Sequence, residues 1–491
     1  MPQAQTGRQR FYHDVQLRGP IPSRFLHTPT PLRHPPDAMI EAVSTLAQSP
    51  STLADGLTPY GLFDSFTWLP ALARAEAGER LAQGMMALWL ERSGRYRPKP
   101  WAPPVVAERV HHLLSHLRMM VVGRDAPWRE AVFDSLARQG RHLRRVEQRA
   151  GADETALRVA MARALIALCF PDDRTTGPPE SSALNRGLEA IAAGQVPPSW
   201  SNPERALRFA AEMATLRDAY RARALTPPQS LAEAQKVVHL FVGGWIEGTG
   251  RIVPLPLGQA GDPTLLATLD PPRRHASGLL LEAVGVYRLE AEETTLWVDG
   301  RDKGGAAGAM TLYANGRPII VNCGAPSSLS AALIPKLATW REALKGPAAA
   351  STLDADISGA PVAEWTEGSP GQGLQVGRRD GSRWHSRQIS LSSDGRAVAG
   401  TDQTDGNAGE ETYRFHLAPE TTIAREAPGV FLLKALGEQA PPWRLAIETE
   451  TAHSQDVESV FAGIDGQVEP SRQIVIRSPD GILEWSITQD G

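Results

Sequence analysis

Residues 310–321 read MTLYANGRPIIV, two short apolar segments joined by Asn315-Gly316. Asn-Gly is a strong signal for a two-residue β-hairpin turn, because that turn requires positive φ at both central residues. Asp394-Gly395 and Asp480-Gly481 stand between similar segments, so they predict two further hairpins over 384–402 and 473–488. Many short strands with regular turn signals favour an antiparallel β-sandwich in the second half of the chain.

The first half of the chain has the apolar spacing of helices. Apolar residues recur with helical periodicity over 65–91, 103–117, 128–146, 156–168, 184–193, 203–216 and 230–242. Short links marked by Pro or Gly separate these segments, which is typical of paired antiparallel helices. We therefore expect a Pro-rich extended arm over 1–40, a helical domain over 41–255 and a β-sandwich over 256–491.

Composition excludes several functional classes. The 491 residues carry a formal net charge of -4, which gives no overall field to attract nucleic acid or an anionic membrane. No apolar run has membrane-spanning length, so membrane insertion is not expected. Cys169 and Cys323 lie in elements of different type, so we expect free buried thiols rather than a disulfide. The polar first ten residues lack the apolar core of a signal peptide, so we expect a cytoplasmic protein, or a periplasmic one if the start is misassigned.

No common catalytic or cofactor motif is present in the sequence. It lacks a phosphate-binding Gly-rich loop, a nucleophile-elbow serine and a paired-cysteine metal site, and we expect no cofactor. His112 and His116 have the i, i+4 spacing of metal ligands, but no third ligand is evident, so we expect a helix face and no metal. The basic run 141–145 predicts a solvated helix face or an anchor for one acidic partner, rather than a nucleic-acid site.

Several short stretches resemble one known family. They are FDSFTWL (63–69), SLARQGRHL (135–143), IVNCG (320–324), WREAL (340–344) with ASTL (350–353), DGR (394–396) with GTD (400–402), and RFHL (414–417). In this order they are similar to the heparinase II/III family of polysaccharide lyase-like proteins, in its compact bacterial branch. The resemblance implies an α/α toroid followed by an antiparallel β-sandwich, the same order of domains that the periodicity predicts.

The resemblance also implies an activity, β-elimination on uronic-acid polysaccharides, and an acidic polysaccharide or oligosaccharide as the ligand. That chemistry must neutralise the uronate carboxylate, remove the proton alpha to it and protonate the leaving oxygen. Family members carry histidines at three motif positions, where this chain has Pro198, Ala306 and Ala350. Proline and alanine have no side-chain group that exchanges a proton.

Five other residues remain as candidates for binding a sugar in a cleft between the two domains: Trp200, Asn202, Arg205, His239 and Trp245. Each also has a structural interpretation, because tryptophans in helical domains are usually core residues and Asn202 before Pro203 suits a helix N-cap.

Three hypotheses follow. The first is a polysaccharide lyase with a rearranged catalytic set. The second is a catalytically inactive glycan-binding or scaffolding protein of envelope or exopolysaccharide metabolism. The third is an interaction module that meets a protein partner through an exposed apolar patch.

Overall fold

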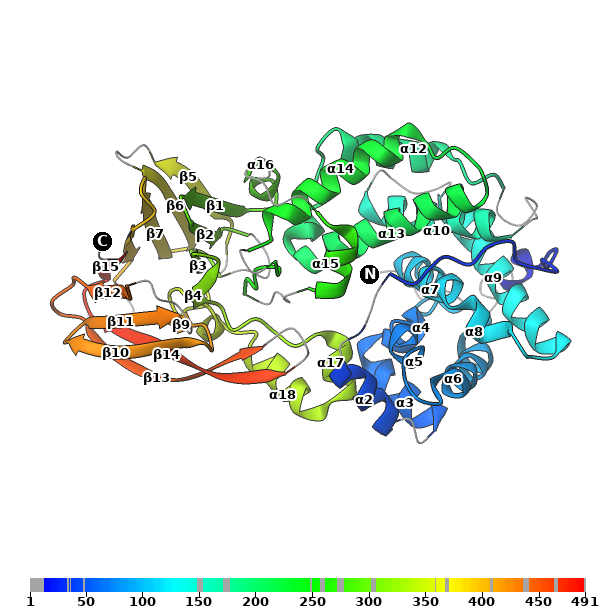
Figure 1. The fold of residues 1–491 in the computed structure, drawn as a ribbon, viewed down its shortest axis with the longest axis horizontal. Helices are drawn as coiled ribbons and strands as arrows, with labels where there is room; N and C mark the ends of the chain where they lie inside the picture. Colours follow the sequence, from blue (N-terminus) through cyan, green and yellow to red (C-terminus); the bar gives the residue numbers. More distant parts are fainter. Residues whose placement is uncertain are drawn as a thin grey trace.

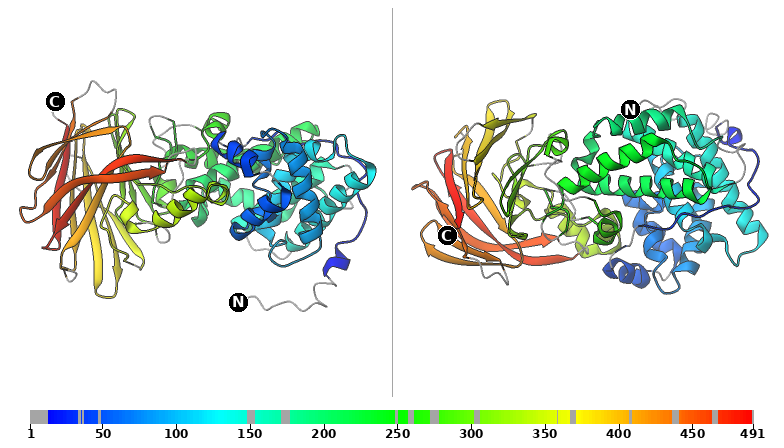
Figure 2. Two further views of the ribbon diagram at one scale, coloured as in Figure 1. Left: turned by 90° about the horizontal axis from the view of Figure 1, so that it is seen from below. Right: turned by 45° about the horizontal axis from the view of Figure 1, so that its top comes forward.

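The computed structural model describes most of the chain, in two parts placed along its long axis (Figures 1 and 2). The described residues are 13–32, 35, 37–46, 49–147, 153–170, 177–247, 250–256, 261–271, 278–301, 306–357, 359–366, 371–406, 409–435, 441–462 and 467–489. Within them, no helix is both long and apolar enough to cross a membrane.

The first part is an α/α toroid built from paired helices. Its helices are α2 (Asp37–Leu46), α3 (Pro50–Leu57), α4 (Leu62–Ser65), α5 (Leu69–Leu72), α6 (Gly78–Ser93), α7 (Pro103–Ser115), α8 (Leu117–Val121), α9 (Ala126–Glu147), α10 (Glu154–Cys169), α12 (Ser182–Ala192), α13 (Pro203–Ala222), α14 (Gln229–Gly244), α15 (Pro263–Leu269) and α16 (Gly278–Glu282). The proposed domain boundary at 255 therefore precedes α15 and α16, and the first strand begins only at Val286.

Local capping explains where several helices begin. The side chains of Ser49, Asp153, Ser181 and Asn202 each accept a hydrogen bond from a backbone amide in the first turn of α3, α10, α12 and α13 respectively. These bonds satisfy amides that have no partner within the helix.

One predicted helix is wrong in its extent. The segment 65–91 is not continuous, because Phe66 and Ala77 take positive φ (61° and 56°) and separate α4, α5 and α6. Gly78 starts α6 so close to the end of α5 that a Cβ there would lie 1.8 Å from the Leu72 carbonyl oxygen. Apolar periodicity continues across these breaks because all three helices bury a face in the same core.

The second part is an antiparallel β-sandwich. Its strands are β1 (Val286–Ala291), β2 (Thr294–Asp299), β3 (Met310–Ala314), β4 (Arg317–Val321), β5 (Pro361–Thr366), β6 (Gly371–Asp380), β7 (Arg383–Ser392), β8 (Ala397–Thr404), β9 (Glu411–Leu417), β10 (Thr421–Ala427), β11 (Val430–Ala435), β12 (Trp443–Ile447), β13 (His453–Ala462), β14 (Val468–Ser478) and β15 (Ile482–Gln489). A seven-stranded sheet has the order β1-β2-β3-β4-β9-β14-β13, and an eight-stranded sheet the order β10-β11-β12-β15-β8-β7-β6-β5.

Two of the three predicted hairpins are confirmed. Asn315-Gly316 joins β3 to β4, and Asp394-Gly395 lies between the paired strands β7 and β8. The prediction at Asp480-Gly481 is wrong, because β14 pairs with β9 and β13 whereas β15 pairs with β8 and β12. This turn carries the chain from one sheet to the other, and the core between the sheets, which includes Ile474 and Trp485, accounts for the apolar residues on both sides of it.

Two of the places where the toroid and the sandwich are attached to each other involve opposite ends of the helical domain. At one, the Trp297 indole nitrogen donates to the Gly244 carbonyl oxygen at 3.0 Å, and Trp297 joins the toroid core. At the other, α17 (Ser328–Leu333), which with α18 (Pro335–Ala343) lies between β4 and β5, contacts α2 and α3 (Figure 1). The sandwich thus holds both ends of the helical domain.

The basic run on α9 binds the chain's own N-terminal arm. Arg141 donates to the Leu17 carbonyl oxygen at 2.8 Å, and Arg145 donates to the Gln16 side-chain oxygen at 2.7 Å. In the preceding turn of α9, Arg138 forms an ion pair with Asp14. For Arg141 and Arg145 the anchored segment belongs to the same chain rather than to a separate acidic partner, whereas Arg144 is exposed, as predicted for a solvated helix face.

Candidate functional site

The three positions that we assign to motif histidines come from three separate segments. Pro198 begins the 3-10 turn η2 (Pro198–Ser201) ahead of α13. Ala306 follows β2, and Ala350 follows the 3-10 turn η4 (Pro347–Ala349). Ala350 is fully buried.

Hydrogen bonds connect these segments at the junction of toroid and sandwich. The Arg301 guanidinium donates to the Ser201 carbonyl oxygen at 3.0 Å. The carboxylate of Asp299, the ion-pair partner of Arg301, accepts from the backbone amide of Ala306 at 3.2 Å. The Thr352 hydroxyl then donates at 2.9 Å to the carbonyl oxygen of the residue after Ala306. The fold therefore brings the three assigned positions to one region of the molecule.

The Asp299–Arg301 ion pair occupies this region. Both side chains are buried, and the guanidinium contacts the two carboxylate oxygens at 2.9 and 2.8 Å. Arg301 also donates to the Pro256 carbonyl oxygen at 2.8 Å, on the toroid side. The pair therefore connects the sandwich to the toroid through the Ser201 and Pro256 carbonyl oxygens.

A second buried cluster supports the loops around Ala306 and Ala350. Arg387 contacts both oxygens of the Asp402 carboxylate at 2.7 and 2.9 Å, and it donates to the carbonyl oxygens of Gly308 and Ser351, each at 2.9 Å. The Trp485 indole donates to the same carboxylate at 2.9 Å. Burial alone would raise the pKa of Asp402, but the Arg387 charge and the hydrogen bonds from His385 and Arg387 hold it at about 2.

This cluster also brings the imidazole of His385 close to the 306–308 loop. Its Nε2 lies 2.7 Å from the Asp402 carboxylate, and a Cβ added to Gly308 would lie 3.6 Å from its ring. The Tyr413 ring lies nearby, with centroids 6.4 Å apart. Both side chains are buried in the sandwich, and burial, the largest influence, raises the pKa of the Tyr413 phenol. This imidazole and phenol are therefore enclosed between the sheets.

The structure does not gather the five sugar-binding candidates. Trp200 and Trp245 are fully buried and pack against Phe241, which agrees with their interpretation as core residues. Asn202 is the N-cap of α13 and accepts from the Glu204 amide at 3.0 Å. Arg205 is exposed on α13. His239 is half-buried on α14, where burial, followed by the Arg217 charge, lowers its pKa.

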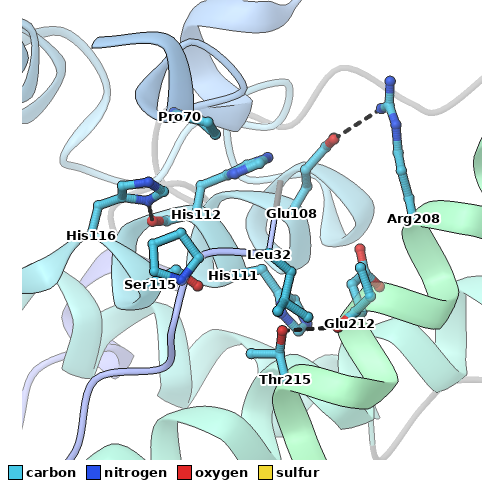
Figure 3. A pocket seen from close by; sticks show the side chains of 12 residues that line it. Leu32, Pro70, Glu108, His111, His112, Ser115, His116, Arg208, Glu212 and Thr215 are labelled. Atoms are coloured by element: carbon cyan, nitrogen blue, oxygen red, sulfur yellow. Dashed lines mark hydrogen bonds and ion pairs between the residues drawn. The ribbon is translucent and has the colours of Figure 1, made fainter. Parts of the chain in front are cut away.

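A polar pocket between α7 and α13 was not predicted from the sequence (Figure 3). Residues of α5 and of the N-terminal arm complete its wall, and its volume is about 50 Å³. Its lining consists of Pro31, Leu32, Pro70, Glu108, His111, His112, Ser115, His116, Arg208, Ala211, Glu212 and Thr215. Drug-sized ligands occupy roughly 300–1,000 Å³, so this pocket is too small for a sugar ring. Nowhere in the described ranges do three metal-ligating side chains group together.

The charges around this pocket are predominantly negative. Arg158 contacts Glu212 at 3.0 and 2.5 Å, while Arg208 bonds to Glu204 at 3.0 Å and lies 3.5 Å from Glu108. Burial would lower the pKa of both arginines, but the neighbouring carboxylates raise it above its ordinary value. A wall that stabilises positive charge in this way disfavours a polyanion.

A larger pocket, of about 390 Å³, lies beside Pro198, between α10 and α12. Asp153 and Glu154 line it, and Glu154 accepts a hydrogen bond from Ser199. Asp153 caps α10 by accepting from the Ala156 amide at 2.8 Å. The pocket has room for a ligand, but its acidic side chains do not complement a uronate carboxylate.

Comparison with known proteins gives matches in the sandwich and over the whole fold. Residues 273–488 match the family model described as Heparinase II/III-like, C-terminal. A segment of 207 residues is 30% identical to FtsZ-localized protein C of Caulobacter vibrioides (strain NA1000 / CB15N), covering 41% of this chain and 35% of that protein. The chain thus matches about a third of the length of this curated relative.

Two solved structures share the architecture. The heparan sulfate lyase HepC from Pedobacter heparinus aligns with a TM-score of 0.55 at 12% identity, over 98% of this chain and 88% of that one. The heparinase III-BT4657 gene product aligns with a TM-score of 0.54 at 11% identity, over 87% of this chain and 78% of that one. At these identities the likeness establishes the fold, a toroid followed by a sandwich.

Proposed function

We propose that this protein, whose sandwich is a heparinase II/III-like C-terminal domain on a lyase-like toroid, binds glycans as a scaffold and does not carry out β-elimination. One observation supports the proposal: the segments that carry Pro198 and Ala306 bond to the Asp299–Arg301 ion pair through the Ser201 carbonyl oxygen and the Ala306 amide. The substituted residues have no side-chain group that exchanges a proton, and the Asp299 carboxylate is fully buried against Arg301.

The buried imidazole supports the same proposal. His385 bonds to Asp402 and is 4% exposed, so a polysaccharide cannot reach it without opening the sandwich. A general base must lie within hydrogen-bond reach of the proton that it abstracts.

The local charge argues against the acidic polysaccharide that the family resemblance implies. Glu108, Glu204 and Glu212 lie close to Arg158 and Arg208 at the pocket between α7 and α13. A uronic-acid polymer would meet more carboxylates than guanidiniums there, and at close range like charges repel. We therefore propose that a glycan binds this protein outside the toroid wall.

The test combines product formation with binding. The protein is incubated with a panel of uronic-acid polymers, and absorbance in the near ultraviolet reports unsaturated ends. We expect no rise in absorbance, together with measurable affinity for at least one oligosaccharide by calorimetry. A rise that follows enzyme concentration would support the lyase hypothesis instead.

A second candidate function rests on the similarity to FtsZ-localized protein C. We propose that this protein associates with FtsZ, in which case it would act as a scaffold in bacterial division. Co-sedimentation with FtsZ polymers tests this directly: the expected result is nucleotide-dependent pelleting of this protein with FtsZ. If it stays in the supernatant with and without polymers, the association is wrong.

A further inference from the structure

The outer face of the eight-stranded sheet carries a pocket lined by residues of β5, β6 and β7. Figure 1 shows these strands in the sandwich. The pocket has a volume of about 320 Å³, within the range of small-ligand sites. The lining residues are Val362, Glu364, Gln375, Gly377, Arg378, Arg379, Trp384, His385 and Ser386. His385 also belongs to the Asp402 cluster described above, and Arg378 bonds to Arg301 at the domain junction.

Strand register places most of the lining side chains on one face of the sheet, whereas Arg378 and His385, which pair with each other, alternate to the opposite face. Arg379 lies opposite Trp384, and Gly377 lies opposite Ser386. On the other side of β6, Gln375 lies opposite Glu364. Since side chains alternate between faces along a strand, these residues project to the same side.

Gly377 forms the floor of the pocket. A Cβ at this position would lie 3.0 Å from the His385 carbonyl oxygen and 3.4 Å from the Ser386 Cβ. Larger side chains stand on either side of the glycine along β6. One wall is held in place, because the Gln375 amide nitrogen donates to the Ser386 hydroxyl at 2.9 Å. The pocket is therefore shaped by the lack of a side chain at Gly377 and by the hydrogen bond between Gln375 and Ser386.

The chemistry of the lining suits a sugar ring. Trp384 offers an apolar aromatic surface, while Gln375 and Arg379 offer donors and Glu364 an acceptor. Arg378 turns away to donate to the Arg301 carbonyl oxygen. This leaves one guanidinium and one carboxylate for the ligand, so the pocket has no excess of either charge.

We propose that this pocket binds one hydroxyl-rich ring of an uncharged oligosaccharide, with Trp384 packing on the ring and Glu364, Gln375 and Arg379 bonding its hydroxyls. The inference rests on the proposed function, that the protein binds glycans. It adds where the glycan binds and that the bound glycan is uncharged. The bond from Arg378 to Arg301 connects the pocket to the ion pair between the domains.

The test is calorimetric titration of the full chain with chitotetraose, an uncharged probe, and with a hyaluronan tetrasaccharide, an acidic probe of equal length. We expect chitotetraose to bind, and Trp384→Ala to weaken it by about tenfold or more, as for a central aromatic contact. The matched control is Trp365→Ala. Trp365 is exposed on β5 but packs on Tyr287, so its loss should change affinity by less than about twofold.

The possible outcomes separate the two proposals. If chitotetraose binds equally to the wild type and to Trp384→Ala, the site is wrong while glycan binding stands. If hyaluronan binds as tightly as chitotetraose, the uncharged class is wrong. If neither probe binds, both the site and the glycan-binding function fail. Should Trp384→Ala lose its folded melting transition, Gln375→Ala, at an exposed position, replaces it with the same expected direction of effect.

Discussion

Replacing Arg387 by methionine is expected to destabilise the sandwich by about 3–5 kcal/mol. Arg387 is fully buried, and its guanidinium bonds both oxygens of the Asp402 carboxylate and two backbone carbonyls, of Gly308 and Ser351. Methionine fills a similar volume, so the substitution leaves no large cavity. The cost arises because the buried Asp402 carboxylate keeps only His385 and Trp485 as hydrogen-bond partners.

Urea unfolding followed by tryptophan fluorescence and circular dichroism measures this loss. The double variant Arg387→Met/Asp402→Leu is the control, because removing both charges should restore much of the stability that the single change removes. If the single variant loses less than about 1 kcal/mol, the buried cluster does not support the fold as described.

Acid should destabilise the wild type through the same carboxylate. The folded-state pKa of Asp402, about 2, lies below its ordinary value of 3.8. Because the pKa is lower in the folded state, the ionised carboxylate stabilises the fold fully at pH values above the unfolded-state pKa. This stabilisation is lost as the pH falls toward the folded-state pKa. The shift corresponds to about 2 kcal/mol, lost between about pH 4 and pH 2. In Asp402→Asn this contribution to the acid dependence should disappear.

Three further predictions concern the domain junction, a helix cap and a thiol. Arg301→Met should loosen the toroid from the sandwich, because it removes bonds to the Ser201 and Pro256 carbonyls. Limited proteolysis should then cut the domain junction faster, and an unchanged rate of cutting would show that Arg301 does not hold the domains together. Asn202→Ala should cost about 1 kcal/mol of unfolding free energy, as expected for a lost N-cap, whereas an effect near zero would show that the cap is dispensable. Burial raises the pKa of Cys323 to about 12, so this thiol should resist Ellman's reagent at pH 8 until the protein is unfolded; rapid reaction in the native state would refute its burial.

Local sequence signals predicted the order of the elements because that order depends on periodicity and turns. The helices α7, α9 and α13 and the hairpin around Asn315-Gly316 follow from signals within a few residues of each other. The turn at Asp480-Gly481 could not be assigned in the same way. A sheet-crossing turn and a hairpin turn use the same residues, and only long-range pairing of β15 with β8 distinguishes them.

The candidate site was predictable only in part. The family resemblance pointed to Pro198, Ala306 and Ala350, and the fold brings these segments together. The ion pair between them is local in sequence, Asp299 with Arg301, but its role depends on toroid carbonyls that are distant in sequence. The arm bound to Arg141 illustrates the same limit, since a basic helix face does not reveal whether its partner lies in the same chain.

Loss of elimination is the central claim, and the most direct measurement is a time course of near-ultraviolet absorbance with heparan sulfate, chondroitin sulfate and hyaluronan. Unsaturated ends are the obligatory product of β-elimination, so the account predicts a flat trace with each polymer at high protein concentration. A steady rise that is abolished when the protein is unfolded would contradict the account.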